Sequence, residues 1–295
     1  MRWWAKNNVS VTMTCLMWAA LLCLTHDAKA QFTPPSSQQE SASDLVSVSV
    51  TSDLKQIAPG QPFQLAFVFS IKPGWHIYWT NPGASGAPTS IKVSAPEGFA
   101  MGDLQFTRPI TIGHWDEPDG LTYGYEDKVV LFVPVVAPES LKDGEVTFEA
   151  HLTYLVCKNY CLFGDERLSI TIPTTKHPST HESQVDPKLL AAMKRLPKPL
   201  LEQEGAKVEF RQGQLIISMQ AGHADVATFF PIERPGITFG KPFIHFENDR
   251  LHVQVDVEVK PQNAIDGNLA ISGVLGLGES RDDPSYAFVF PVSNP

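Results

Sequence analysis

Two cysteines separated by three residues are the feature of this sequence that points most directly to chemistry. Cys157 and Cys161 follow an alternating stretch, residues 148–156, and precede another, residues 168–173, so a tight connection between two strands is expected here. Such a connection can bring two Cα atoms to the ~5.5 Å that a disulfide requires. The spacing therefore permits a disulfide and leaves its purpose open.

Three uses of the pair fit the sequence. As a structural bridge, a loop of five residues gains only ~2 kcal/mol in the chain-entropy model, against nearly ~5 kcal/mol for a loop of ~100 residues. As a redox pair, one thiolate attacks a partner's disulfide and the second cysteine resolves the mixed disulfide. A metal site needs more ligands, and the neighbouring sequence supplies no obvious third or fourth. The short loop favours exchange, and neither metal nor cofactor is predicted.

Charged and aromatic residues flank the cysteines. Lys158 favours a neighbouring thiolate, whereas Asp165 and Glu166 oppose one. Tyr154 and Tyr160 are candidates to shield the pair from solvent, although a tyrosine beside a strand end more often serves ordinary packing. These neighbours leave the acidity of the two thiols open.

The first thirty residues have the pattern of a secretory signal. Arg2 and Lys6 precede an apolar stretch at about residues 11–24, and Ala28-Lys29-Ala30 forms an A-x-A site, which predicts cleavage after Ala30. A membrane anchor is an alternative, but the apolar run is shorter than the ~20 residues of a spanning helix. A lipoprotein signal ending at Cys23 is the weaker alternative, because Leu22 precedes it where a small residue is expected.

Signal removal changes the composition in two ways. Cys15 and Cys23 are lost, so Cys157 and Cys161 would be the cysteines of an exported chain, in a compartment where disulfides persist. Three basic residues and one acidic residue are lost as well, which moves the formal charge from −9 to −11. An acidic chain offers no basic footprint for phosphate, and a nucleic-acid partner is therefore excluded.

Short alternating stretches separated by turn clusters predict an all-β fold. Residues 45–50, 63–69 and 145–153 alternate with period two, as strands with one buried face do. Turn formers cluster between them at residues 58–60 and 142–144. Many short strands without a long helical period favour an antiparallel β-sandwich.

A second β domain is expected after a linker. Asp186 and Pro187 have the residue types of a helix start, and prolines at positions 197 and 199 end the helix. Residues 251–259 alternate strictly, and the turn at 247–250 predicts a hairpin with residues 242–246. We therefore expect two antiparallel β-sandwich domains joined by a short helical linker. The expected units are a signal peptide at 1–30, a disordered leader at 31–43, sandwiches at 44–175 and 201–295, and a linker at 176–200.

Other candidate residues are weaker. The aromatic cluster of Trp75, Tyr78 and Trp79 is expected to fill a core rather than bind a ligand. Asn81-Pro82-Gly83 is predicted to be a turn. The histidines show no metal-like spacing and are expected to be ordinary surface or strand residues: His76, His114, His151, His223, His245 and His252.

Two sequence blocks together resemble a known family. One is Thr153-Tyr154-x-x-Cys157-x-x-x-Cys161, preceded by Tyr123-Gly124, and the other is the block from Gly74 to Gly86 with its Trp and Asn-Pro-Gly residues. Over about residues 45–175 the chain is similar to the N-terminal periplasmic domain of DsbD, the thiol:disulfide interchange protein, and most similar to its ScsB-like branch.

This resemblance implies a fold, an activity and partners. It implies an immunoglobulin-like sandwich whose pair accepts electrons from a membrane-embedded thiol-disulfide donor and reduces thioredoxin-like or other disulfide-bearing proteins of the periplasm. It also implies a cap loop over the pair, here at Thr122-Tyr123-Gly124, where threonine replaces the family's aromatic residue. Tyr123 or Trp115 would then provide the shielding, and Gly124 belongs to the same motif.

The resulting hypothesis is a periplasmic protein-disulfide reductase, or interchange component, that works through a reversible Cys157–Cys161 disulfide. The family pattern favours Cys161 as the attacking thiol. Because the chain stops at Pro295, a separate membrane protein is expected to supply the electrons. The alternative is a non-enzymatic periplasmic adaptor with a structural disulfide, and the ScsB-like resemblance adds a possible link to copper tolerance.

Overall fold

The computed structural model describes residues 40–113, 120–177, 186–260 and 269–292. The expected signal peptide, Cys15, Cys23, most of the expected leader, and Trp115 and His114 lie outside these residues. Ala42–Asp44 forms a 3-10 turn in which Ala42 is buried, so ordered structure begins two residues before the expected start of the first domain. None of the helices in the described ranges has the length and hydropathy that crossing a bilayer requires.

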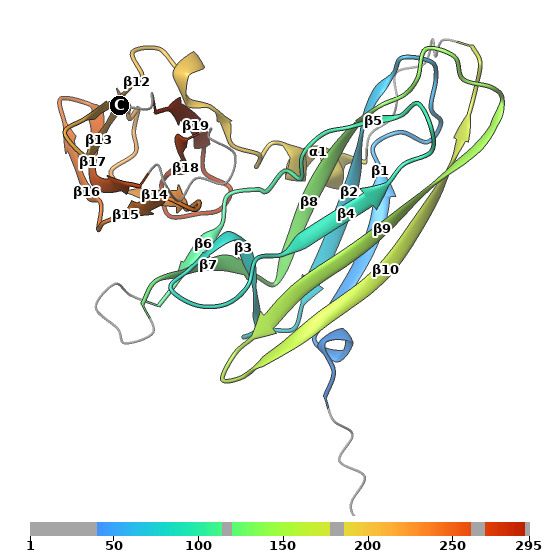
Figure 1. Cartoon of the computed structure of the whole chain (residues 1–295), viewed down its shortest axis with the longest axis horizontal. Coiled ribbons are helices and arrows are strands. Elements are labelled where there is room, and N and C mark those ends of the chain that lie inside the picture. The colour runs from blue at the N-terminus through green and yellow to red at the C-terminus, as the bar shows by residue number, and fades with distance from the viewer. Residues whose placement is uncertain (1–39, 114–119, 178–185, 261–268, 293–295) are drawn as a thin grey trace, which may run out of the picture. The chain divides into compact units, whose positions relative to one another are not determined.

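The first half of the described chain is a β-sandwich of two sheets (Figure 1). One sheet has the order β1-β2-β8-β5, formed by Val46–Ser52, Pro62–Ile71, Lys128–Val136 and Ala100–Met101. The other has the order β10-β9-β3-β7-β6, with β4 also paired to β9, formed by Cys161–Thr174, Gly144–Cys157, His76–Gly83, Thr122–Glu126, Ile110–Ile112 and Ser90–Ser94. All of these pairings are antiparallel, as expected from the sequence.

Alternation along the strands explains why the two sheets pack face to face. In β2, Phe63, Leu65, Phe67 and Phe69 are all buried, and in β9 the alternate residues from Phe148 to Val156 are buried as well. Both sets belong to one hydrophobic cluster. Trp75 and Trp79 join that cluster, and Tyr78 is also buried, which confirms the expectation that these aromatics pack.

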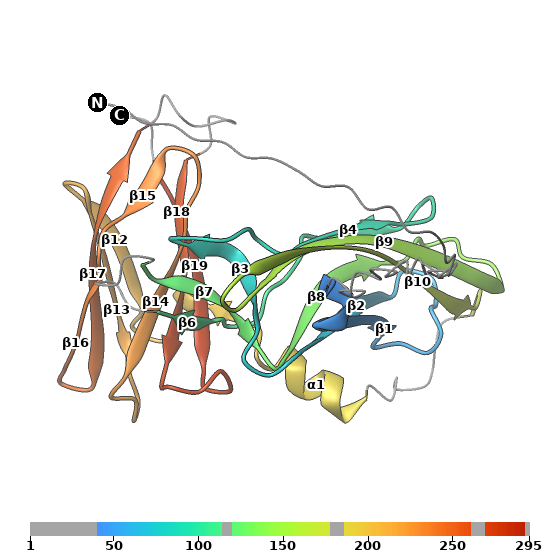
Figure 2. The ribbon, with the colours of Figure 1, turned by 90° about the horizontal axis from the view of Figure 1, so that it is seen from below.

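The linker helix begins where the sequence predicts and is shorter than expected. Helix α1 spans Pro187–Met193, and the Asp186 side chain accepts a hydrogen bond of 2.8 Å from the backbone N–H of Lys188. Leu189 and Ala192 pack against Ala66 and Phe132 of the first sandwich, so α1 covers the outer side of the sheet that contains β2 and β8 (Figure 2). This apolar contact explains why so short a helix is stable.

The second half of the described chain is another β-sandwich. Its sheets have the orders β11-β19-β18-β14 and β12-β13-β17-β15, with β16 also paired to β17. The strands are Lys198–Pro199, Ser285–Pro291, Ala270–Leu277, Ala227–Ile232, Lys207–Arg211, Gln214–Gln220, Arg250–Val259, Ile237–Phe239 and Phe243–Glu247. The predicted hairpin is confirmed: β16 and β17 pair, and Asn248 and Asp249 both take the positive φ of a type I′ turn.

Two buried polar side chains of the first sandwich bind the backbone of the second. The Asn81 amide donates a hydrogen bond of 2.8 Å to the carbonyl of Pro231. The Arg108 guanidinium donates hydrogen bonds of 2.7 and 2.6 Å to the carbonyls of Leu277 and Gly278.

The turn predicted at residues 81–83 is wrong, because these residues end β3, where the register with β7 shifts.

Candidate functional site

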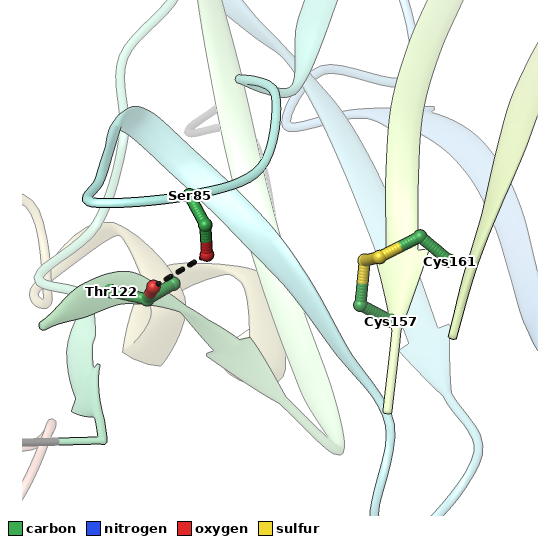
Figure 3. The surroundings of a disulfide bond; sticks show 4 residues. All are labelled: Ser85, Thr122, Cys157 and Cys161. Carbon is green, nitrogen blue, oxygen red and sulfur yellow. Dashed lines mark hydrogen bonds between the residues drawn. A yellow bond between two sulfur atoms is a disulfide. The ribbon is translucent and has the colours of Figure 1, made fainter. Parts of the chain in front are cut away.

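The cysteines form a disulfide across the end of one hairpin. Cys157 is the last residue of β9 and Cys161 is the first of β10, and the two are direct register partners with their Cα atoms 4.2 Å apart. Figure 3 shows the bond joining the two strands. The three-residue loop between them is closed by a hydrogen bond of 3.1 Å from the N–H of Lys158 to the carbonyl of Tyr160. The pairing that the spacing permits is therefore present.

The two cysteines differ in exposure. Cys157 is 2% exposed, whereas Cys161 is exposed to solvent. A thiolate of another protein can therefore reach the sulfur of Cys161 much more readily than that of Cys157. This difference divides the pair into a presented cysteine and a protected one.

Tyr160 anchors the loop between the cysteines. Its ring packs edge-on against the buried Trp75, with ring centroids 5.0 Å apart. Its hydroxyl donates a hydrogen bond to Glu40, which raises the pKa of Tyr160, and Glu40 also pairs with Lys72 at 3.1 Å. The loop is therefore held to the start of the fold and to residues just before β3.

The acidic residues beside the pair have partners of their own. Asp165 pairs with His151 at 2.9 Å, and Glu166 accepts a hydrogen bond of 2.5 Å from the hydroxyl of Tyr154. The ammonium of Lys158 lies over Gly74, 3.1 Å from the point where a Cβ would stand. The ammonium of Lys158 therefore lies beside the turn that leads into β3.

The residues expected to shield the disulfide lie in the core. Tyr123 is 2% exposed and packs against Trp79, and Tyr154 is 1% exposed and packs against Phe69. Burial is the main cause that raises the pKa of both hydroxyls. Their contacts lend the shielding role no support, and it stays a prediction.

The other cap positions have structural partners. Gly124 pairs with Tyr78, and a Cβ on Gly124 would stand 2.3 Å from the carbonyl oxygen of Ile77, so the close approach of β3 and β7 requires glycine. The hydroxyl of Thr122 lies 3.4 Å from the hydroxyl of Ser85. Figure 3 shows these two residues apart from the disulfide.

One exposed aromatic residue beside the disulfide was not singled out from the sequence. Phe163 lies two residues after Cys161, on the same face of β10, and is 64% exposed. Its direct partner across the hairpin is Leu155 of β9, which is partly buried. Strand alternation was the available signal, since it places residues 161 and 163 on one face. Phe163 therefore adds an exposed apolar side chain close to the accessible cysteine.

Within the described ranges, no group of three or more His, Cys, Asp or Glu side chains is arranged to hold a metal ion. His245 and His252 are direct partners on β16 and β17 and their rings stack 5.1 Å apart. His76 lies at the start of β3, opposite Cys157.

Comparisons with known proteins agree with this geometry. Residues 42–173 match the family model described as "Thiol:disulfide interchange protein DsbD, N-terminal". No curated protein matches the chain.

Among solved structures, the N-terminal periplasmic domain of ScsB from Proteus mirabilis superposes with a TM-score of 0.58 and 21% identity, covering 85% of this chain and 95% of that one. A family 123 glycoside hydrolase from Clostridium perfringens matches with a TM-score of 0.27 and 9% identity, covering 45% of this chain and 28% of the other. The pilin subunit BcpA of Bacillus cereus matches with a TM-score of 0.27 and 9% identity, covering 84% and 66%.

The match to the ScsB domain supports a similar fold over both sandwiches. The TM-scores of the other two structures are too low to carry an argument. The family match covers the disulfide and every strand of the first sandwich apart from the last residue of β10. Residues 42–173 are therefore similar to the DsbD N-terminal family.

Proposed function

We propose that this chain is a periplasmic thiol-disulfide exchange protein that accepts electrons from a membrane-embedded donor and passes them to exported proteins through Cys157 and Cys161. The observation that carries the proposal is the division of the pair: Cys161 is exposed, while its partner Cys157 is 2% exposed. An exchange reaction needs one sulfur that meets the partner and a second that stays close by to resolve the mixed disulfide.

The reaction follows from that division. In the reduced protein, the Cys161 thiolate attacks a partner's disulfide, forms a mixed disulfide and releases one partner thiolate. The Cys157 thiolate then attacks the sulfur of Cys161, which forms the internal disulfide and releases the second partner thiolate. The partner gains two electrons and two protons, and the cysteine pair loses them. Reduction by the membrane donor reverses these steps.

Location and partners rest on the relatives. The solved ScsB domain is periplasmic by its description, and the family is named for thiol:disulfide interchange. The secretory signal expected at residues 1–30 agrees with export. The exposed Phe163 offers an apolar contact for a thioredoxin-like or other disulfide-bearing partner. A link to copper tolerance stays a prediction from the ScsB-like resemblance.

The test is the reduction potential of the pair in the purified chain after signal removal. The chain is equilibrated in glutathione buffers, and the fraction of reduced cysteines is measured by alkylation and mass spectrometry. A potential above about −300 mV is expected for an exchange pair. A lower value would identify a structural bridge, and the adaptor hypothesis would replace the exchange hypothesis. The unchanged chain, fully reduced with excess dithiothreitol before alkylation, calibrates the fully reduced signal.

A further inference from the structure

Four residues with reactive or titratable side chains lie in one row across four adjacent strands. Cys161 of β10 pairs with Cys157 of β9, Cys157 pairs with His76 of β3, and His76 pairs with Glu126 of β7. The sheet order β10-β9-β3-β7 makes these pairings consecutive. Direct partners on antiparallel strands project from the same face with Cβ atoms about 4.5–5.5 Å apart. The row therefore places an imidazole next to the protected cysteine.

The other residues of β3 show which face this is. Ile77 pairs with Val156, and both belong to the hydrophobic core between the sheets. His76 and Cys157 alternate with these residues and therefore project from the opposite face. The imidazole and the sulfur thus share the face of the sheet that lies outside the core.

His76 is suited to accept a proton. Its side chain is half-buried, and its ring lies 5.2 Å from that of Tyr78. Among the residues that the structure describes, no hydrogen bond or ion pair involves its ring nitrogens. Burial lowers the pKa of His76, so the imidazole is neutral at neutral pH and has a free lone pair.

Two charged residues are neighbours of His76 in the fold. Glu126 is its direct register partner on β7. Lys158, in the loop after β9, has its ammonium beside Gly74, two residues before β3 begins. Tyr78, on the same strand, contributes a hydroxyl whose pKa is raised by burial. Burial is the cause that lowers the pKa of His76.

We propose that His76 is the proton acceptor for Cys157 when Cys157 resolves the mixed disulfide on Cys161. The inference rests on the proposed function. The thiol of Cys157 gives its proton to the imidazole, and the sulfur electron pair forms the bond to Cys161. The partner's cysteine leaves with the electron pair of the broken bond, and its thiolate takes a proton from the imidazolium or from water. In the reductive direction, the imidazolium protonates the departing Cys157 thiolate.

The experiment uses dithiobis(nitrobenzoate) as the disulfide and the reduced chain after signal removal. Attack by Cys161 releases one coloured thionitrobenzoate, and resolution by Cys157 releases a second. Stopped-flow absorbance measures the rate of the second release from about pH 5 to about pH 9.5, on both sides of the ordinary thiol pKa of ~8.5. The His76→Gln variant is compared with the unchanged protein.

If His76 accepts the proton, the decrease in rate of the His76→Gln variant should depend on pH. At neutral pH, the His76→Gln variant should release the second thionitrobenzoate at least about tenfold more slowly. Loss of a general base usually slows a reaction by ~10²- to 10⁴-fold, so a tenfold decrease is a conservative threshold. The deficit should vanish above about pH 9, where the thiol ionises without help. The unchanged protein should show an inflection below the ordinary histidine pKa of ~6.5. The control is His151→Gln, which removes a partly exposed histidine of β9 bonded to Asp165 and should leave the rate unchanged.

Each other outcome has a distinct meaning. Equal rates in the two proteins, or a deficit of the same size at every pH, would overturn the role of His76. If the variant does not fold, the profile of the unchanged protein decides, because absence of the low inflection also overturns the role. If the unchanged protein releases no second thionitrobenzoate, the proposed exchange function itself fails.

Discussion

Cys157 and Cys161 face each other directly across the β9–β10 hairpin, yet Cys157 is 2% exposed while Cys161 is open to solvent. Neighbouring positions in a hairpin usually share their exposure when their side chains lie on one face. Here Cys157 lies on β9, between β10 and β3, whereas Cys161 lies on β10 at the edge of the sheet. The position of each strand in the sheet therefore accompanies the difference in exposure of the two cysteines.

The first prediction concerns single-cysteine variants. Cys157→Ser leaves the exposed thiol and should accumulate a mixed disulfide with oxidised glutathione. Cys161→Ser leaves the protected thiol and should form it roughly tenfold more slowly, because reactivity follows access as well as acidity. Intact-mass spectrometry over time measures the glutathione adduct. Equal rates in the two folded variants would contradict the division of roles.

The second prediction concerns Phe163, which is 64% exposed beside Cys161. Phe163→Ser should slow exchange with a thioredoxin-like protein by roughly fivefold or more, since truncating a central interface aromatic commonly costs over ~1 kcal/mol. Exchange with dithiobis(nitrobenzoate) should stay unchanged, because a small disulfide needs no protein contact. Stopped-flow kinetics with each substrate gives both rates.

Phe243→Ser is the matched control for Phe163, because Phe243 is 61% exposed and lies in the second sandwich. This variant should react like the unchanged protein with both substrates. Loss of rate in both variants would point to a general effect of surface hydrophobicity and not to docking beside the disulfide.

The third prediction concerns Arg108, which is 4% exposed and donates hydrogen bonds to three backbone carbonyls between positions 277 and 280. Arg108→Ala leaves these acceptors without a donor and should lower the free energy of unfolding by about 3 kcal/mol. Urea denaturation followed by circular dichroism measures the loss. Arg211→Ala, which removes an exposed ion pair with Glu209, should change it by no more than about 0.5 kcal/mol. Equal losses would contradict the structural role of Arg108.

The fourth prediction concerns Gly124, whose Cβ would stand 2.3 Å from the carbonyl oxygen of Ile77. Gly124→Ala should force β3 and β7 apart and lower the free energy of unfolding by about 1–3 kcal/mol, the usual cost of overpacking. In Gly240→Ala the nearest atom to the new Cβ is 3.5 Å away, an ordinary contact. Thermal unfolding should therefore show a clear decrease in midpoint for the first variant and little for the second. The role assigned to Gly124 is wrong if the two midpoints agree.

Local sequence patterns predicted the all-β fold and the cysteine pairing. Cys157 and Cys161 are joined by a short hairpin, so their register depends on residues close in sequence. The helix start at Asp186 was predictable for the same reason, because capping is a local interaction. The two sandwiches followed from alternation, which needs no knowledge of which strands are neighbours.

Features that depend on distant pairing were not predictable. His76 was grouped with scattered histidines, because its position opposite Cys157 depends on the register between β3 and β9. Asn81-Pro82-Gly83 contains turn-forming residues, yet Asn81 is buried and bonds to Pro231, 150 positions away. Tertiary contacts outweighed local preference at that site, and one sequence does not contain the pairing that decides it.

The strand β3 begins opposite Cys157 and, near its other end, bonds to the backbone of the second sandwich through Asn81. The second sandwich contains neither cysteine nor tryptophan. Its backbone nevertheless accepts a hydrogen bond near one end of the strand whose first residue is the register partner of Cys157. A single strand therefore joins the surroundings of the disulfide to the second sandwich.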